Sequence, residues 1–379
     1  MREHWTNCIT HFDDKVDAFI ENYFEDENKR ALLVAAAGFD PRSRRVTELL
    51  SQRMHNRLKA IFIREERPGA SPALQERADN NEASLRLVVP DCVVTNVDIF
   101  ADDGAPIGGS QIVNVLLNNP IPTDVTDVIV DLTALSIGVG FPAARMLLEE
   151  CEGRKDCVFH LLIASNPDLD DRIKSDPSNR PGPVKGFAPL PPIGDDGDLD
   201  VAQIWIPQLA TGLASTLAKI GQQFPDRYKV CPLLPFPSRN PRRADDLVTE
   251  YVTEISEEWR VDPRDLVYAS ERNPLDTYRL LSRLKQRFDR TMEGTYALQM
   301  ILSPIGSKAM AAGAMMAAID HDMSIHYVET DQYTMETENA GGGADVTHEE
   351  SSLVHIILAG PLYANFPSSL IKPMAEEVR

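Results

Sequence analysis

The 379-residue sequence contains few cysteines and no long apolar run, and both features restrict the classes of protein to which it can belong. Its five cysteines are scattered without a CxxC pair, and its eight histidines show no HExxH or HxH spacing. This pattern favours reduced structural thiols, so we expect no metal and no cofactor. No window approaches the ~18 apolar residues of a membrane helix, and residues 1–5 lack the apolar core of a signal peptide. We expect a cytoplasmic protein without membrane contact.

Positive charge is also scarce, because 38 Lys and Arg residues face 58 Asp and Glu residues and give a formal net charge of −20. Long nucleic acids need a positive surface for their phosphates, so this balance argues against DNA or RNA as a partner. Locally the balance is reversed. Residues 42–67 contain eight basic and three acidic residues (+5), and residues 272–290 contain six basic and two acidic residues (+4). A small anionic ligand is therefore compatible with the sequence.

Short apolar runs alternate with helical stretches along the chain. A run such as residues 31–37, which is apolar on both faces, is typical of a central parallel strand. The alternation predicts an α/β doubly wound fold. Further strands are predicted at residues 60–63, 92–95, 127–130, 158–163, 230–234, 266–269, 297–302, 325–328 and 354–358, and helices at residues 43–60, 143–150, 205–222, 244–259, 276–290 and 307–319.

A proline-rich stretch divides this series into two Rossmann-like parallel-sheet halves, which we expect to be related by a pseudo-two-fold. Six prolines lie between residues 174 and 200, and an acidic run closes the stretch at residues 195–200. The acidic run lacks the glycine and glutamate of a calcium loop, so we interpret the stretch as a stiff, solvated linker. The expected segments are an N-terminal amphipathic helix at 1–30, half one at 31–173, the Pro-rich linker with a helix at 174–226, and half two at 227–379.

Three turns that follow strands are similar in the two halves and occur in the same order, which indicates an internal repeat. Ligands of open parallel sheets bind outside the carboxyl ends of the strands, where all three turns are predicted to lie. The turns pair Asp40-Pro41-Arg42 with Asn240-Pro241-Arg242-Arg243, Arg64–Pro68 with Ser270–Pro274, and Leu135-Ser136-Ile137-Gly138 with Leu302–Lys308. The repeat predicts a composite ligand site.

The turn Gly306-Ser307-Lys308 has the composition of an anion-binding helix start. A glycine permits close backbone approach, and a helix N-terminus offers unpaired N–H groups beside the hydroxyl and the ammonium group. It is not a Walker A loop, because the upstream glycine and the Ser or Thr after the lysine are missing. The alternative is a serine-capped helix of small residues that binds nothing.

Arginines and tyrosines near the predicted strand ends have two interpretations each. Arg42, Arg242 and Arg243 lie at strand-to-helix turns and contact either phosphate or the opposite half. Tyr333 and Tyr363 either stack on a base or pack in the core or at its rim.

Two residues are weak candidates for catalysis. Glu271 follows a predicted strand and could act as a general base, although an ion pair with Arg272 is the commoner arrangement. Ser303 precedes the glycine turn and is a candidate for catalysis or for ligand binding. It has no histidine near it in sequence. Because no GxSxG elbow, Cys–His pair or paired-carboxylate motif is present, binding is favoured over catalysis and the enzyme question stays open.

Residues 300–333 resemble the C-terminal signature of CRISPR-associated Rossmann-fold (CARF) sensor domains: a strand, the Gly306-Ser307-Lys308 turn, a small-residue helix and a strand from Ile325. A chain with two such halves resembles the related SAVED domains, which are fused CARF pairs of bacterial antiphage signalling. The resemblance implies a cyclic oligonucleotide bound between the halves. It implies ligand contacts by Gly38, Asp40, Arg42, Ser136, Gly138, Ser238, Asn240, Arg242, Gly306, Ser307 and Lys308. No lysine follows Gly138, so half one departs from the pattern and holds either a weaker cradle or none.

These observations predict a binding module that recognises a phosphate-bearing nucleotide, with a cyclic oligonucleotide messenger of antiphage defence as the implied ligand. The implied protein partner is a product of the same defence operon. One alternative is an enzyme that cleaves or transfers a nucleotide group in the same cleft. Another is a scaffold subunit of a defence complex with a vestigial cleft. The ligand's identity, its turnover, the downstream effector and the oligomeric state stay open.

Overall fold

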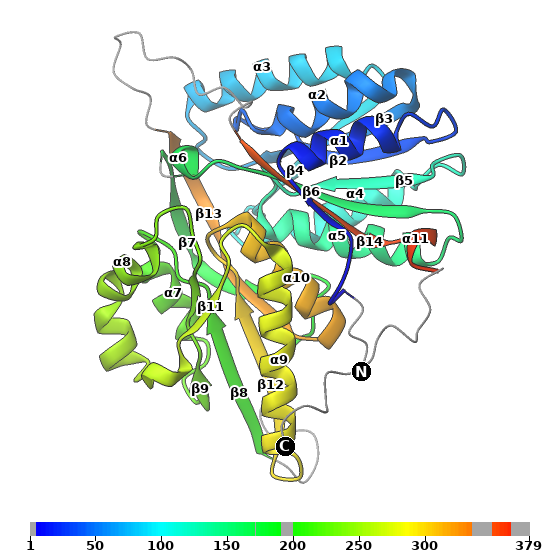
Figure 1. Ribbon diagram of the computed structural model, residues 1–379. Helices are drawn as coiled ribbons and strands as arrows, with labels where there is room; N and C mark the ends of the chain where they lie inside the picture. Colours follow the sequence, from blue (N-terminus) through cyan, green and yellow to red (C-terminus); the bar gives the residue numbers. More distant parts are fainter. Residues whose placement is uncertain (1–4, 171, 191–199, 336–350, 365–379) are drawn as a thin grey trace.

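The computed structural model describes residues 5–170, 172–190, 200–335 and 351–364. Two sheets form two halves of the molecule, the first above the second in Figure 1. The predicted α/β architecture with two Rossmann-like halves is confirmed. Within the described ranges, no helix is long and apolar enough to cross a lipid bilayer.

The first sheet has seven strands in the order β1-β14-β6-β5-β2-β3-β4. Its strands β2 to β6 are parallel, β14 runs antiparallel to β6, and β1 pairs antiparallel with β14 at the edge. The order of the parallel strands, β4-β3-β2-β5-β6, is that of a doubly wound sheet with its switch point between β2 and β5. The bounds are β1 Thr10–Phe12, β2 Ala31–Ala36, β3 Leu58–Glu66, β4 Cys92–Asp98, β5 Asp127–Asp131, β6 Val158–Ser165 and β14 Ser352–Ala359.

Helices cover both faces of this sheet, which is why β2 is buried along its whole length. On one face Val16 and Leu50 pack with Leu33, and on the other Ile112 packs with Val34. Helices α1 to α3 form the first layer, and α4 and α5 form the second (Figure 1). The bounds are α1 Asp14–Tyr23, α2 Ser43–Met54, α3 Pro72–Val88, α4 Gly108–Asn118, α5 Ile137–Glu152 and the short α6 Pro167–Asp170 and α11 Pro361–Ala364.

The second sheet has five strands in the order β7-β13-β12-β8-β9. A parallel bridge between Gln208 and Leu233 continues it into the small parallel pair β10-β11. Counted in sequence from β8, the strands repeat the doubly wound order of the first sheet, with β7 antiparallel at the same edge position as β14. The bounds are β7 Ile173–Pro183, β8 Asp200–Pro207, β9 Lys229–Val230, β10 Leu233–Pro235, β11 Val267–Ala269, β12 Tyr296–Ser303, β13 Ser324–Met335, α7 Ala214–Gly221, α8 Arg243–Glu250, α9 Pro274–Met292 and α10 Lys308–His321.

The two halves exchange their outer strands. After β6 the chain leaves the first sheet and forms β7 at the edge of the second, and after β13 it returns and places β14 in the first. The segments 1–30 and 227–379 therefore both supply strands to the first sheet, through β1 and β14. How the chain divides into domains stays a prediction, but sequence order alone does not separate the two sheets.

The first part of the Pro-rich segment, up to Pro183, forms a strand where a solvated connector was predicted. Pro177, Pro181 and Pro183 lie in β7, which among the described strands pairs only with β13 and so forms a sheet edge. Proline is tolerated on an edge strand because the outer N–H groups have no ladder partner there. Residue 200 onward forms β8, a central strand of the second sheet, while residues 195–199 lie outside the described part.

One apolar core joins the halves. It contains the inner faces of α5 from the first half and α10 from the second, for example Leu147 and Met315. Gly138 of α5 lies so close to β13 that a Cβ atom there would overlap the Tyr327 hydroxyl and the Glu329 carboxylate. The carboxyl ends of both sheets consequently meet at one place.

Candidate functional site

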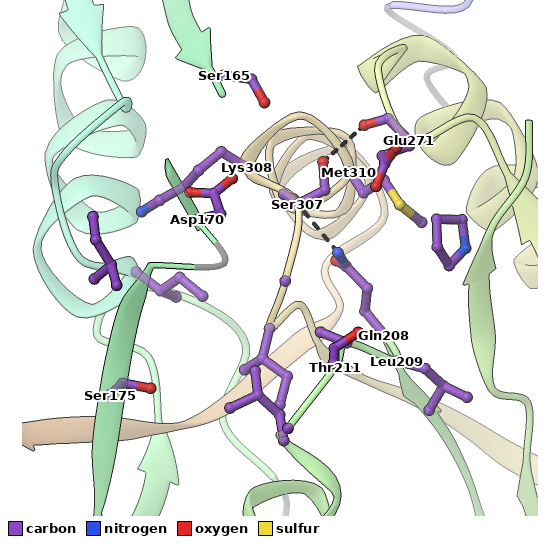
Figure 2. Close-up of a pocket in the computed structure, with 18 of the residues that line it drawn as sticks. Ser165, Asp170, Ser175, Gln208, Leu209, Thr211, Glu271, Ser307, Lys308 and Met310 are labelled. Carbon is purple, nitrogen blue, oxygen red and sulfur yellow. Dashed lines mark hydrogen bonds between the residues drawn. The ribbon is translucent and has the colours of Figure 1, made fainter. Parts of the chain in front are cut away.

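A cavity of about 930 Å³ lies where the carboxyl ends of the two sheets meet. The first half contributes the start of α5 and the end of β6, and the second contributes the start of α10 and the loop after β8. Residues from both sides are drawn in Figure 2, among them Ser165, Gln208 and Ser307. Of the residues predicted for the site, six line the cavity: Ser136, Arg243, Glu271, Gly306, Ser307 and Lys308.

The start of α10 is fixed by a glycine and a serine. Gly306 has φ +130°, and a Cβ atom on it would lie 2.9 Å from Gln208 Nε2 and 3.0 Å from Ala210 Cβ. The Ser307 hydroxyl does not cap the helix but donates a hydrogen bond of 2.7 Å to the Glu271 carbonyl oxygen (Figure 2). The first N–H groups of α10 therefore have no side-chain cap, and residues 306–308 at this helix start line the cavity.

Lys308 is directed away from Ser307, toward the first half (Figure 2). Its ammonium group donates a hydrogen bond to the Leu135 carbonyl oxygen at the end of the turn that precedes α5. Burial lowers the pKa of this lysine, and the carboxylates of Glu65, Asp170 and Asp40 partly oppose that shift. The lysine predicted for the anion cradle thus also bridges the two halves.

The start of α5 is the counterpart in the first half. The backbone N–H of Ser136 donates a hydrogen bond of 2.7 Å to Glu65 Oε1, so a carboxylate already occupies part of this helix start. The hydroxyl oxygen of Ser136 is buried without a hydrogen-bond partner. Gly138 packs against β13 and does not line the cavity.

A buried charge cluster closes the wall between α5 and β13. Arg67 lies 2.8 Å from Glu65 Oε2 and 3.7 Å from Glu329 Oε2, and its guanidinium group stacks on the Tyr333 ring at 5.1 Å. Burial raises the pKa of Glu329 to about 7, although Arg67 and the Tyr327 hydroxyl oppose the shift. Tyr333, predicted either to stack on a base or to pack, lines the cavity with Arg67 over its ring.

Three further polar side chains of the cavity wall carry buried oxygens without a hydrogen-bond partner. They are Gln208 Oε1, Thr216 Oγ1 and Ser351 Oγ, and each residue is less than a tenth exposed. A buried polar atom without a partner is costly, and these three oxygens are available to accept a hydrogen bond from a ligand or from water. None of the three was predicted, because the sequence around them carries no motif.

The predicted turn after β10 reaches the cavity only in part. Arg239, Arg243 and Glu271 line it, and the Arg239 N–H donates a hydrogen bond of 3.2 Å to Glu271 Oε2. Ser238 and Asn240 hold the turn together instead and are not among the lining residues. The Arg242 side chain is 81% exposed and points elsewhere, with Asp246 at 4.0 Å.

The predicted turn after β2 is closed by its own ion pairs. Arg42 is buried and bonds Asp40 at 2.7 Å and Asp170 at 2.7 Å, and these carboxylates raise its pKa above the usual value although burial opposes this. The Gly38 carbonyl oxygen accepts a hydrogen bond from Asn81. Of these residues only Asp170 lines the cavity.

Ser303 and Tyr363 are directed into the protein. The Ser303 hydroxyl, fully buried, accepts a hydrogen bond of 2.9 Å from Trp205 Nε1. The Tyr363 hydroxyl donates to the Ile357 carbonyl oxygen and accepts from the Ile9 N–H. Neither residue lines the cavity.

Comparison with known proteins finds no family model and no curated protein that matches the chain. Two solved structures are similar at a low level. A protein from Burkholderia cenocepacia described as a dehydrogenase, with bound NADP, is 10% identical over 72% of this chain and 91% of its own, with a TM-score of 0.21. The NH3-dependent NAD synthetase from Campylobacter jejuni, in complex with nitrate, is 11% identical over 82% of this chain and 92% of its own, with a TM-score of 0.20. At these TM-scores neither likeness supports an argument about the site.

Proposed function

We propose that the cavity between the two halves binds a phosphate-bearing nucleotide. The observation that carries the proposal is the convergence of two helix starts, of α5 and of α10, on one cavity. Both starts lie at the positive end of a helix dipole, which favours phosphate. The start of α10 has no side-chain cap, whereas at α5 the Ser136 N–H already bonds Glu65. The volume of about 930 Å³ lies near the upper end of small-molecule sites, roughly 300–1,000 Å³, and leaves room for more than one nucleotide unit.

The charge of the wall supports an anionic ligand. Although the whole chain has a net charge of −20, the charges of the described lining residues nearly cancel. Five are basic, namely Lys174, Arg239, Arg243, Arg272 and Lys308, and four are acidic, namely Asp13, Asp170, Glu271 and Glu329. The lining therefore carries a small positive surplus, opposite in sign to the net charge of the whole chain, which favours a small anion.

The finer proposal follows the resemblance to CARF and SAVED domains. On that reading the ligand is a cyclic oligonucleotide messenger of bacterial antiphage defence, and the chain is its sensor. Ser136, Arg243, Gly306, Ser307 and Lys308 are the residues that we propose for the ligand contacts, because they are predicted for the site and line the cavity.

Two adjacent arginines provide a matched test of the proposal. Arg243 lines the cavity, whereas the mostly exposed Arg242 does not. Calorimetric titration with mononucleotides and with linear and cyclic oligonucleotides should find a ligand for the unmodified protein. Arg243→Gln should weaken its binding about tenfold or more, since a charged hydrogen bond contributes roughly 1.5–3 kcal/mol. Arg242→Gln should leave binding unchanged. No binding to any nucleotide, or equal losses in the two variants, would contradict the proposal.

The same titrations separate the two alternatives. Turnover of a bound nucleotide that is lost in Glu271→Gln would assign an enzyme instead of a sensor, because Glu271 is the catalytic candidate that lines the cavity. A stable complex with another protein that is indifferent to all nucleotides would favour a scaffold.

A further inference from the structure

Three histidines and an aspartate form one hydrogen-bonded line across the first sheet. His11 Nδ1 lies 3.0 Å from His355 Nδ1, and His355 Nε2 lies 3.0 Å from His160 Nδ1. His160 Nε2 in turn lies 2.9 Å from Asp127 Oδ1. One member comes from each of the neighbouring strands β1, β14, β6 and β5. The four side chains are therefore held in sequence by the strand order.

Helix α1 seals this line from water except at one end. His355 and His160 are each 1% exposed and Asp127 is fully buried, whereas His11 is partly exposed. Phe19 stacks on the rings of His11 and His355 at 4.6 and 4.5 Å, and Tyr23 covers His160. Protons from solvent reach the line at His11.

Asp127 is ionised at the buried end. Its carboxylate accepts hydrogen bonds from Tyr23 (2.8 Å), Thr126 (2.5 Å) and His160, and the Lys29 ammonium lies 3.9 Å away. Burial would raise the pKa of Asp127, but the hydrogen bonds from His160 and Thr126, the Lys29 ammonium and, once His160 is protonated, its charge lower the pKa overall. Every bond to the carboxylate is therefore one that it accepts.

An ionised Asp127 fixes the tautomer of all three neutral rings. His160 must carry its proton on Nε2 to donate to the carboxylate, so its Nδ1 accepts from His355 Nε2. His355 Nδ1 then accepts from His11 Nδ1, and His11 Nε2 is left as the acceptor at the open end. No other arrangement of three protons satisfies all three bonds.

We propose that His11, His355, His160 and Asp127 form a relay that takes up one proton from solvent at His11 and holds it as an ion pair between His160 and Asp127. When His11 Nε2 gains a proton, its Nδ1 proton passes to His355 Nδ1. The Nε2 proton of His355 then passes to His160 Nδ1. The two hydrogen bonds between the histidines are kept with their directions reversed, and His160 Nε2 still donates to Asp127. The added charge then lies on the His160 imidazolium beside the Asp127 carboxylate. A second proton would place two N–H groups against each other and break a bond of the line.

The relay couples pH to the wall of the cavity. Strand β1 ends at Phe12, and the next residue, Asp13, lines the cavity and bonds Arg272 at 2.7 Å. Loss of the bond between His11 and His355 would loosen β1 from β14 and, with it, this ion pair between the halves. The relay is independent of nucleotide binding, so either can fail without the other.

Other titratable groups surround the line, and their charges are of both signs. Lys15 and Tyr23 face it from α1, Asp26 and Lys29 from the following loop, and Cys157 from the start of β6. Burial lowers the pKa of His11 and of His355 from the ordinary 6.5. Lys15 adds to this for His11, and protonation of another ring of the line adds to it for both. We expect the three rings to respond together when the proton is taken up on acidification.

Nitrogen NMR of the histidine rings in the full chain tests the relay. At pH 8, His11 should be protonated on Nδ1, and His355 and His160 on Nε2. On acidification all three rings should change with one common midpoint, and His160 should become the imidazolium. Hydrogen exchange should then show that β1 loses protection at a lower pH, where the second proton is bound. A His11 that carries its proton on Nε2 at pH 8, or that titrates while His160 stays neutral, would overturn the proposal.

The variant His355→Gln tests whether the rings are linked by proton transfer or by hydrogen bonding alone. Glutamine can accept from His11 and donate to His160, but it cannot pass a proton. In this variant His11 should titrate alone and His160 should stay neutral. His326→Gln is the control, because His326 is buried in the second sheet with Gln223 as its partner, and the common midpoint should persist there. A common midpoint that survives in His355→Gln would also contradict the relay.

Discussion

At the scale of single residues, the wall between the halves is held by groups whose charge depends on their burial. Glu329 is 3% exposed and lies beside Tyr327, with Arg67 3.7 Å away. Burial raises its pKa from 4.5 to about 7, so the folded protein holds this proton more tightly than the unfolded chain does. Protonation of Glu329 therefore stabilises the fold. This contribution is complete below pH 4.5 and disappears as the pH rises through about 7.

Glu329→Gln should remove this part of the pH dependence. Glutamine is neutral at every pH, so the free energy of unfolding of the variant should fall less between pH 4.5 and 7 than that of the unmodified protein. The difference can reach about 3 kcal/mol, since each pKa unit corresponds to roughly 1.4 kcal/mol. Asp131, whose pKa burial raises to about 7, contributes with the same sign, so the dependence is reduced and not abolished.

Urea unfolding at a series of pH values measures the effect. Glu149→Gln is the control, because Glu149 is mostly exposed and pairs only with Arg145 on the surface of α5. Equal pH profiles for Glu329→Gln and the unmodified protein would show that Glu329 is ionised in the fold at neutral pH.

The site residues could be predicted from the sequence only where a local motif indicated them. The turn of Gly306, Ser307 and Lys308 was found because a helix start with these residues has a local signature, and all three line the cavity. The Lys308 bond to Leu135 could not be predicted, because it joins residues 173 positions apart. Gln208 could not be found either, since burial of an ordinary amide is a property of tertiary packing.

At the scale of elements, the central strands were predictable because they are buried on both faces and read as continuous apolar runs. The same reasoning missed β7, whose prolines argue against a strand unless the strand lies at an edge. It also placed β14 in the second half, since an apolar run does not say which sheet it joins. Register and sheet membership are set by long-range pairing that no local window contains.

Helix α10 provides a test of packing between elements. A Cβ atom on Gly313 would lie 2.8 Å from Thr277 Cβ and overlap the Pro274 carbonyl oxygen of α9. Helix propensity alone would make Gly313→Ala stabilising by about 1 kcal/mol, whereas overpacking should make it destabilising by roughly 1–3 kcal/mol. Gly153→Ala is the control, because its new Cβ would meet only ordinary contacts of 3.4 and 3.8 Å. Thermal unfolding distinguishes the two signs, and a stabilised Gly313→Ala would mean that α9 and α10 can move apart freely.

At the scale of the whole molecule, the exchange of β7 and β14 makes each sheet depend on the other half of the chain. The shared core between α5 and α10 adds apolar contact, and Asp13 pairs with Arg272 across the halves. Charge is distributed unevenly over this unit, because a chain of net charge −20 surrounds a cavity with nearly balanced lining. The strongly negative net charge therefore argues against a long polyanion, whereas the nearly balanced cavity can hold a short one.

This exchange should make the protein unfold as one cooperative unit. Leu33 is fully buried in β2 of the first sheet, and Leu33→Ala should cost about 2–5 kcal/mol. Because β14 and β7 couple the stability of the two sheets, the amides of β12 in the second sheet should lose as much opening free energy as those of β2. Native-state hydrogen exchange in low denaturant measures both. Two halves joined only by a flexible connector would behave differently: β2 would lose protection while β12 kept its own, and that result would contradict the structural coupling argued from the exchanged strands.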